Sequence, residues 1–323
     1  MRSEIPGHEE AGRRGGSQMR IAVLHSKVKL GAKRSNARRH SILIEKVLSM
    51  RSVDLIILPS YPFTGPVIGY YPPSKARLKL REMAEKISEK NIPAGPSVSS
   101  MARWSQEYGV YIIGGPIIER AGPRIYVSTV MTSPDGSIAG KYRKIVLTEM
   151  EQHLGISPGK EPGVFSVRSN STGLNLGIFV DEDLAVPEVF RHLQLGNVSL
   201  IIGNMMPYNS KYLGNIVDDG GLITMDHTII KTFLEVRARE TGVPMIMVGG
   251  IIDSGVETIA YMSTIPVEPD EGVIEGKMFG PDDDSPIFIE ISEKTPITRS
   301  PPEAAKFLLK SLCRVNNNIV KSK

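Results

Sequence analysis

The stretch LNLGIFVDEDLAVPEVFR, residues 174–191, changes from apolar to acidic residues and then to a helical pattern. It begins with an apolar run at 174–180, which is typical of a buried strand. The acidic triplet Asp181, Glu182 and Asp183 follows directly. Pro187 then opens a short helix, because proline is favoured at the first helical position. The chain therefore passes from a buried strand to a helix across three carboxylates.

The same alternation of strands and helices continues on both sides of this stretch. The apolar runs and turn signals predict strands at 21–24, 54–58, 111–115, 125–131, 137–142, 199–203, 244–248, 258–265 and 286–291. Helical spacing predicts helices at 74–90, 97–108, 222–241 and from Ser300 onward, with Trp104 in the core. Continuous apolar strands between helices indicate a sheet that is covered by helices, an α/β layer fold.

Composition excludes several classes of protein. The chain has 323 residues, 41% of them hydrophobic and 23% charged, which is typical of a globular protein. Its single cysteine, Cys313, excludes an internal disulfide framework and indicates a reducing compartment. Neither a membrane span nor a signal peptide is recognisable, so we expect a cytoplasmic protein without a membrane partner. Residues 1–18 are predicted to be a disordered tail, and translation starting at Met19 is an alternative.

Positive charge is concentrated near the amino terminus. The net charge is +4, and the densest basic stretch, 27–40, contains Lys27, Lys29, Lys33, Arg34, Arg38, Arg39 and His40. This stretch contains no aromatic side chains of the kind that stack on single-stranded nucleic acid. We interpret it as the solvated face of a loop and helix and expect no nucleic-acid partner. A polyanion-binding module in this stretch is the alternative.

Three motifs, in this order and spacing, resemble those of the nitrilase superfamily of carbon–nitrogen hydrolases. The first motif, at 54–65, is a strand followed by Pro59. The second, at 134–159, contains a Tyr-Arg-Lys sequence. The third, at 176–191, consists of a strand, the sharp turn at which the family has its nucleophile, and a helix. The sequence RARE at 237–240 resembles a helix end of that family. The resemblance implies a four-layer αββα sandwich in a single domain at 19–295, followed by a C-terminal helical tail at 296–323.

The resemblance also implies where a catalytic site would lie. Hydrolysis of an amide or nitrile through a covalent intermediate needs a nucleophile, a general base and a cation that stabilises the oxyanion. The family uses Cys, Glu and Lys, with a second Glu that helps to position them. Carried over residue by residue, the lysine is Lys144 and the second glutamate is Glu151, with Glu149 as the alternative. The base position is Ser60 and the nucleophile position is Asp181.

Ser60 in place of the family's glutamate and Asp181 in place of its cysteine lead to two hypotheses about function. Because Lys144 is expected beside Asp181, we predict a buried ion pair and a lowered pKa that makes Asp181 a poor nucleophile. The first hypothesis is therefore a nitrilase-like protein that has lost the cysteine chemistry and acts in binding, regulation or assembly. The alternative is a divergent hydrolase of amides or nitriles that uses Lys144, Glu151 and Asp181.

Further site residues and partners complete the predictions. We expect Tyr61, Glu182, Asn204 and Met205 to line the pocket, together with Glu149, and a small amide-like molecule to be the ligand. We expect no cofactor and no metal, because Asp183 is explained as a first-turn acid of the next helix and the histidines lack metal-ligand spacing. The resemblance implies a homodimer or higher homo-oligomer through Pro187–Gly196 and the C-terminal tail.

Overall fold

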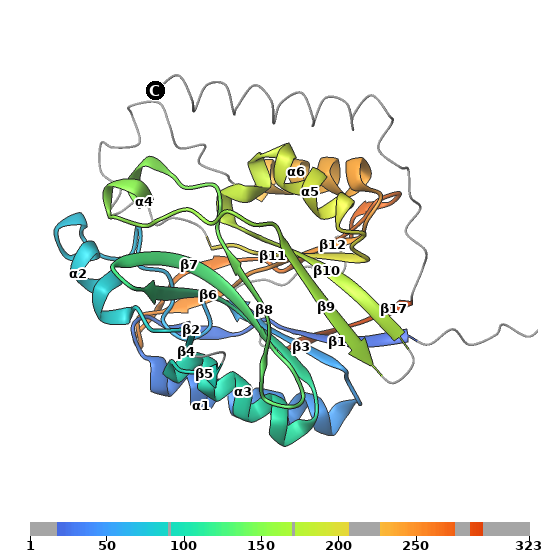
Figure 1. Ribbon diagram of the computed structural model, residues 1–323, viewed down its shortest axis with the longest axis horizontal. Helices are drawn as coiled ribbons and strands as arrows, with labels where there is room; N and C mark the ends of the chain where they lie inside the picture. The colour runs from blue at the N-terminus through green and yellow to red at the C-terminus, as the bar shows by residue number, and fades with distance from the viewer. Residues whose placement is uncertain (1–17, 90–91, 170–171, 207–226, 275–284, 293–323) are drawn as a thin grey trace, which may run out of the picture.

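Two six-stranded sheets stack face to face in the part of the chain that the structure describes (Figure 1). The structure is a computed structural model and describes residues 18–89, 92–169, 172–206, 227–274 and 285–292. The first sheet contains, in spatial order, β17 (Pro286–Ser292), β1 (Gln18–Leu24), β3 (Leu55–Ser60), β6 (Tyr111–Ala121), β7 (Arg124–Thr132) and β8 (Ile138–Arg143). The second contains β16 (Gly272–Val273), β15 (Ile265–Glu268), β12 (Met245–Val248), β11 (Leu200–Asn204), β10 (Thr172–Val180) and β9 (Gly163–Ser169).

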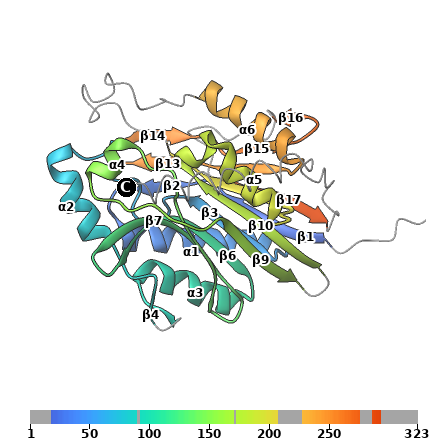
Figure 2. The same cartoon turned by 45° about the horizontal axis from the view of Figure 1, so that its top comes forward.

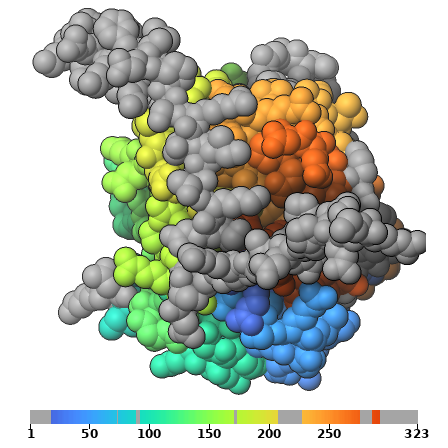
Figure 3. Space-filling model, turned by 90° about the vertical axis from the view of Figure 1, so that its right-hand side faces the viewer, coloured from blue at the N-terminus to red at the C-terminus, as the bar shows by residue number. Residues whose placement is uncertain are grey.

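Helices cover the outer face of each sheet, which confirms the predicted αββα sandwich. Helices α1 (Lys33–Met50) and α3 (Pro96–Tyr108) lie on the first sheet, and α5 (Pro187–Leu195) and α6 (His227–Thr241) lie on the second (Figures 1 and 2). In the space-filling view, the blue N-terminal segments lie at the bottom and the lighter orange segments lie at the top, with darker orange segments between them (Figure 3).

Alternation along the strands explains why their apolar runs are continuous. In β1, Ile21 and Val23 face the second sheet, whereas Ala22 and Leu24 pack with the residues of α1 and α3. Trp104 of α3 belongs to this outer cluster and is buried, as predicted. Successive side chains point to opposite faces of a strand, so a sheet that is buried on both faces needs apolar residues at every position.

The predicted helix at 74–90 is too long. Helix α2 (Pro73–Met83) ends before Ala84, which has an extended backbone. Glu85 instead lies beside β6, where its N–H donates to the carbonyl of Ile118 at 3.0 Å. Its buried carboxylate also accepts from Lys33 at 2.8 Å. These long-range contacts end the helix, and the two short strands β4 (Ser88–Glu89) and β5 (Ile92–Pro93) follow.

The predicted strand at 258–265 is two strands in different sheets. β14 (Thr258–Met262) pairs with β13 (Gly250–Asp253) in a three-stranded sheet whose third member is β2 (Lys27–Lys29), and β15 belongs to the second large sheet. The break falls at Ser263 and Thr264, where the Thr264 hydroxyl accepts from Gly249 N at 3.1 Å. Neither β2 nor β13 was predicted, because both are short, and the longer β9 was not predicted either.

The basic stretch 27–40 is not one solvated face. His40 is fully buried, and its Nε2 lies 2.7 Å from the carbonyl oxygen of Pro62. Burial lowers the pKa of His40 to about 4, so the ring is neutral at pH 7. Lys33 is bound to Glu85, whereas Arg34 and Arg38 are exposed. Polyanion binding through this stretch stays an untested alternative, with fewer exposed charges than the sequence suggested.

Several predictions fall outside the described residues. They are residues 1–17 of the N-terminal tail predicted at 1–18, the start of the helix at 222–226, and the C-terminal tail at 296–323, which includes Cys313. Gln18, the last residue of the predicted N-terminal tail, instead begins β1. Among the described helices, none combines the length and the apolar character that crossing a membrane requires.

Candidate active site

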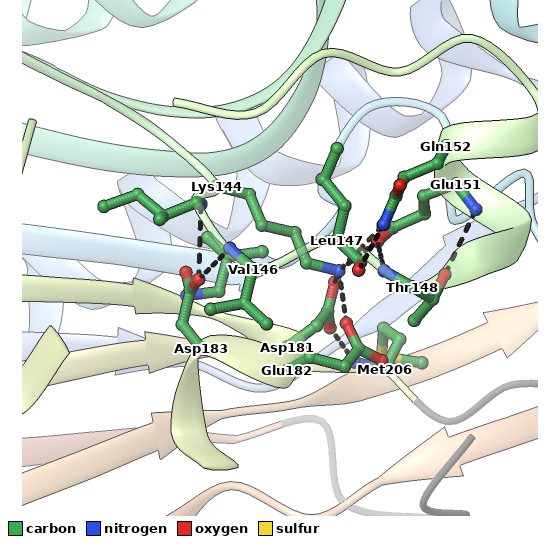
Figure 4. Close-up of polar contacts among 12 residues, drawn as sticks. Lys144, Val146, Leu147, Thr148, Glu151, Gln152, Asp181, Glu182, Asp183 and Met206 are labelled. Carbon is green, nitrogen blue, oxygen red and sulfur yellow. Dashed lines mark hydrogen bonds and ion pairs between the residues drawn. The ribbon is translucent and has the colours of Figure 1, made fainter. Parts of the chain in front are cut away.

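Four of the predicted site residues, Lys144, Glu151, Asp181 and Glu182, converge from distant parts of the chain (Figure 4). Lys144 directly follows β8, and Glu151 lies on the short helix α4 (Glu149–His153). Asp181 follows the last residue of β10 and begins the 3-10 helix η1 (Asp181–Ala185). Tyr61 follows β3, and Met206 lies shortly after β11. The site is therefore assembled by strand ends from both sheets.

Lys144 is the centre of the site. Its side chain is fully buried, and Nζ lies 2.7 Å and 2.8 Å from the two carboxylate oxygens of Glu151. Nζ also contacts Glu182 Oε2 and lies 3.8 Å from Asp181 Oδ2. Burial opposes the charged ammonium, but the attraction of these three carboxylates outweighs it and raises the pKa of Lys144. Lys144 is therefore a permanent cation with three acidic neighbours.

Glu151 is held in place by the start of α4. A capping box joins it to Thr148: the Glu151 N–H donates to Thr148 Oγ1 at 3.1 Å, and Glu151 Oε2 accepts from Thr148 N at 2.9 Å. Glu149, at the first position of the same helix, is exposed. Of the two candidates for the second glutamate, Glu151 contacts Lys144, whereas the Glu149 side chain is exposed.

Asp181 is held by two donors from different loops. Its Oδ2 accepts from the Tyr61 hydroxyl at 2.9 Å, and its Oδ1 accepts from Met206 N at 3.3 Å. Asp181 and Tyr61 both have positive φ angles, +46° and +52°, in the left-handed region that non-glycine residues seldom adopt. Backbone strain of this kind is often concentrated at functional sites.

The predicted lowering of the Asp181 pKa is wrong. Burial, together with the negative charges of Glu182 and Glu151, raises the pKa of Asp181 to about 8, in spite of the Lys144 ammonium. The predicted ion pair of Lys144 and Asp181 is present at 3.8 Å, but Glu151 and Glu182 lie closer to Nζ. The contact of Glu182 with Lys144 was not predicted, and it adds a negative charge near Asp181.

Asp183 has a structural role that its local sequence concealed. It is fully buried in the first turn of η1, the 3-10 helix that follows β10 and precedes α5. It accepts hydrogen bonds from the Tyr142 hydroxyl at 2.7 Å and from the backbone N–H groups of Val146, Val180 and Ile145 at 2.8, 2.9 and 3.2 Å. Asp183 thus ties the loop after Lys144 to the turn that carries Asp181.

Ser60 and Asn204 are buried, but in the described part of the chain they make no hydrogen bond to the charged groups. The Ser60 hydroxyl and the Asn204 Nδ2 have no hydrogen-bond partner among the described residues, and Asn204 Oδ1 accepts from Thr129 Oγ1 at 3.3 Å. Met205, the next residue, is also buried. The base position therefore holds a short hydroxyl side chain that makes no hydrogen bond to Lys144.

A small pocket adjoins the charged cluster. Glu151, Asp181 and Tyr61 contribute its polar wall, and apolar side chains contribute the rest, including Pro66, Val67, Ile68, Ile118, Val127 and Ile156. Of the predicted pocket residues, Tyr61 lines this pocket, whereas Glu149, Glu182, Asn204 and Met205 are not among its lining residues; neither is Ser60. In the described part of the chain, no three His, Cys, Asp or Glu side chains are placed to hold a metal ion.

The raised pKa of Asp181 predicts a pH dependence of stability. The carboxyl has a pKa of about 8 when folded and about 4 when unfolded, so the folded state binds more protons between pH 4 and pH 8. The free energy of unfolding therefore falls as pH rises through this window. We expect Asp181→Asn to make this decline shallower, by at most about 1.4 kcal/mol per pH unit.

Urea denaturation at pH 5 and pH 8 measures this effect. The matched control is Asp135→Asn in an exposed turn, because hydrogen bonds from Ser133 and Ser137 lower the pKa of Asp135 to about 2. That carboxyl is almost fully ionised in both states at pH 5 and at pH 8. Equal pH slopes for Asp181→Asn and the wild type would contradict the prediction.

Comparison with known proteins connects this geometry to a family. The family model described as carbon-nitrogen hydrolase matches residues 17–218. Omega-amidase NIT2 of Danio rerio is 25% identical over 169 residues, which are 50% of this chain and 54% of that protein. The chain thus matches only about half the length of this curated relative.

Two solved structures share the fold at low sequence identity. Nit3 of Saccharomyces cerevisiae, a member of branch 10 of the nitrilase superfamily, has a TM-score of 0.67 at 16% identity, covering 88% of this chain and 97% of that one. An amidase variant from Nesterenkonia sp. AN1, with acrylamide added at its active-site cysteine, has a TM-score of 0.63 at 14% identity, covering 90% and 99%.

Proposed function

Because the chain belongs to the carbon–nitrogen hydrolase family, we propose that it has kept the family pocket as a binding site and lost cysteine-dependent hydrolysis. In this proposal the protein acts in binding, regulation or assembly. The observation that carries the proposal is the state of Asp181 at the nucleophile position, where both carboxylate oxygens accept hydrogen bonds. A carboxyl whose pKa is raised to about 8 is largely protonated near neutral pH, and a protonated carboxyl is a poor nucleophile.

The general base and the cation that stabilises the oxyanion, which hydrolysis also requires, lack a suitable group as well. Ser60 has no useful proton affinity near neutral pH, so it cannot replace a glutamate as general base. Lys144 Nζ is already bonded to Glu151 and Glu182, which occupy the ammonium that would otherwise stabilise an oxyanion. Attack by Asp181 on an amide would also form a mixed anhydride, which is less stable than a thioester.

One observation favours the divergent hydrolase as a second candidate. With a pKa of about 8, Asp181 is largely a neutral carboxylic acid at pH 7, beside Lys144 and Glu151. A buried acid of this kind can donate a proton to a leaving amine, as general acids do. In that mechanism the nucleophile would be water, and Asp181 would not form a covalent intermediate.

Hydrolysis assays separate the two candidates. We expect the wild type to release no ammonia from a broad panel of amides and nitriles, and the double variant Ser60→Glu/Asp181→Cys to gain measurable turnover. The matched control is Glu149→Ala, which changes an exposed glutamate near the site. Turnover by the wild type that disappears in Asp181→Ala would overturn the binding proposal and support the hydrolase.

The predicted homodimer stays a prediction. Its proposed surface, Pro187–Gly196, includes Leu195, whose exposed fraction is 49%. The C-terminal tail, which is the other part of the predicted interface, lies outside the described residues.

A further inference from the structure

An open hollow lies between the start of α1 and the residues of α2. Its volume is about 540 Å³, which is in the range of small-molecule binding sites. The side chains that line it include Lys33, Arg34, Ser35, Tyr71, Lys79 and Met83. None of its lining residues belongs to the pocket beside Asp181. The hollow is therefore a second site, and the proposed function does not use it.

Lys33 joins the two helices and fixes the wall of the hollow. Its Nζ donates to the backbone carbonyl of Met83 at 2.7 Å and to Glu85 Oε2 at 2.8 Å. Glu85 is buried and also accepts from the backbone N–H and the hydroxyl of Ser97, both at 3.0 Å. The fold therefore holds Lys33 in place, and Glu85 balances its charge.

Arg34 and Lys79 are the cations of the hollow that a ligand can reach. Arg34 is exposed and makes no hydrogen bond or ion pair with the residues that the structure describes. Lys79 is paired with Glu82 at 2.7 Å, and the two side chains are 35% and 47% exposed. Exposed pairs of this kind contribute little stability, so an anionic ligand can replace Glu82 beside Lys79 at low cost.

Positive charge exceeds negative charge around the hollow. Its charged lining residues are Lys33, Arg34, Lys79 and Glu82. When Glu85 is counted as the partner of Lys33, three cations still face two carboxylates. A further exposed arginine, Arg38, lies one turn along α1 on the same face as Arg34. The excess positive charge favours an anion.

We propose that this hollow binds a small organic phosphate. The phosphate group contacts Arg34 and Lys79, and the uncharged part of the molecule lies against Tyr71 and Met83. A phosphate ester carries up to two negative charges near neutral pH, and its oxygens accept the hydrogen bonds that guanidinium and ammonium groups donate. The apolar surface of Tyr71 and Met83 favours a phosphate with an organic substituent over the free ion.

The basic stretch at 27–40 contributes only one side of this site. Lys33 and Arg34 come from that stretch, whereas Lys79 lies on α2, more than 40 positions later in the chain. A small molecule fits better than a nucleic acid, because the cations line a concave hollow rather than an extended groove. Among the described lining residues, Tyr71 is the one aromatic side chain, which is too few for a platform on which successive bases stack.

Three probes test the class of ligand. Isothermal titration calorimetry of the full chain at pH 7.5 compares phenyl phosphate with phenol, which lacks the phosphate, and with inorganic phosphate, which lacks the ring. We expect phenyl phosphate to bind at least about tenfold more tightly than phenol, and more tightly than inorganic phosphate. Equal or tighter binding of phenol or of inorganic phosphate, or no measurable binding of phenyl phosphate, would overturn the inference.

Variants test whether the binding occurs in this hollow. Arg34→Ala removes an exposed side chain without internal contacts, so we expect it to fold normally and to weaken phenyl phosphate binding about tenfold. Glu82→Gln removes the carboxylate that competes for Lys79 and should tighten binding. The matched control is Arg103→Ala, which removes an exposed arginine of α3 outside the lining of the hollow and should leave binding unchanged. Unchanged binding in Arg34→Ala, or an equal loss in Arg103→Ala, would contradict the inference.

A gel retardation assay with a single-stranded oligonucleotide tests the nucleic-acid alternative. At about physiological salt, we expect no retardation by the wild type. Retardation that disappears in Arg34→Ala would overturn the small-molecule site and identify a nucleic-acid surface instead.

Discussion

Lys144→Ala is expected to lower the free energy of unfolding by about 3–5 kcal/mol, because it leaves Glu151, Asp181 and Glu182 buried without their cation. Part of the cost will appear as proton uptake, since buried carboxylates without a partner protonate to avoid ionisation. The destabilisation should therefore be larger at pH 8 than at pH 5. Urea denaturation followed by circular dichroism at both pH values measures it.

Lys141→Ala is the matched control for this substitution. Lys141 lies three residues earlier in the chain and contacts Glu119 at 3.1 Å, but its side chain is 32% exposed. Exposed ion pairs contribute only about 0–1 kcal/mol, so we expect a small change. A loss in Lys144→Ala no larger than that in Lys141→Ala would show that the buried cluster does not depend on its cation.

Asp183→Ala is expected to cost about 3 kcal/mol or more. The substitution removes the acceptor of four hydrogen bonds, three of them from backbone N–H groups. A single buried donor left without an acceptor costs roughly 1–3 kcal/mol, so several such donors give a large loss. Because Asp183 joins the loop of Lys144 to the turn of Asp181, binding in the pocket should weaken as well.

Tyr142→Phe separates the contribution of one donor from the rest. It removes only the hydroxyl that donates to Asp183 and leaves the three backbone N–H groups satisfied. We expect a loss of about 1 kcal/mol in the free energy of unfolding, the usual contribution of one hydrogen bond. Equal losses in Tyr142→Phe and Asp183→Ala would contradict the proposed role of the backbone contacts.

With Asp181 at the nucleophile position, the site still contains the buried cation Lys144 and several carboxylates. The ammonium of Lys144 is bonded to these carboxylates, so it is less available to stabilise an oxyanion. Lys144 is bonded to Glu151 and Glu182, and Asp181 is held by Tyr61 and Met206. These contacts stabilise the pocket and at the same time occupy the groups that hydrolysis would require. A pocket that is retained without its reaction is suited to recognition, which is the basis of the proposed function.

The sequence pattern alone predicted the strand and helix alternation, whereas the αββα sandwich and the site positions of Lys144, Glu151 and Asp181 followed from the resemblance of its motifs to the nitrilase superfamily. A strand pattern depends only on neighbouring residues, and each motif lies within a short segment of the chain. Both can therefore be recognised in the sequence without a structure. The length of α2 and the division of 258–265 were not readable, because contacts such as that of Glu85 with β6 override local preference.

Only the tertiary structure decided the electrostatics of the site. The pKa of Asp181 depends on its burial and on Glu182 and Glu151 as much as on Lys144. The donors of Asp183 come from residues up to 41 positions away in the chain. A pKa depends on the summed effect of burial and of every nearby charge, and both depend on distances in space. The sequence could therefore place the carboxylates together but could not predict which of them would hold a proton.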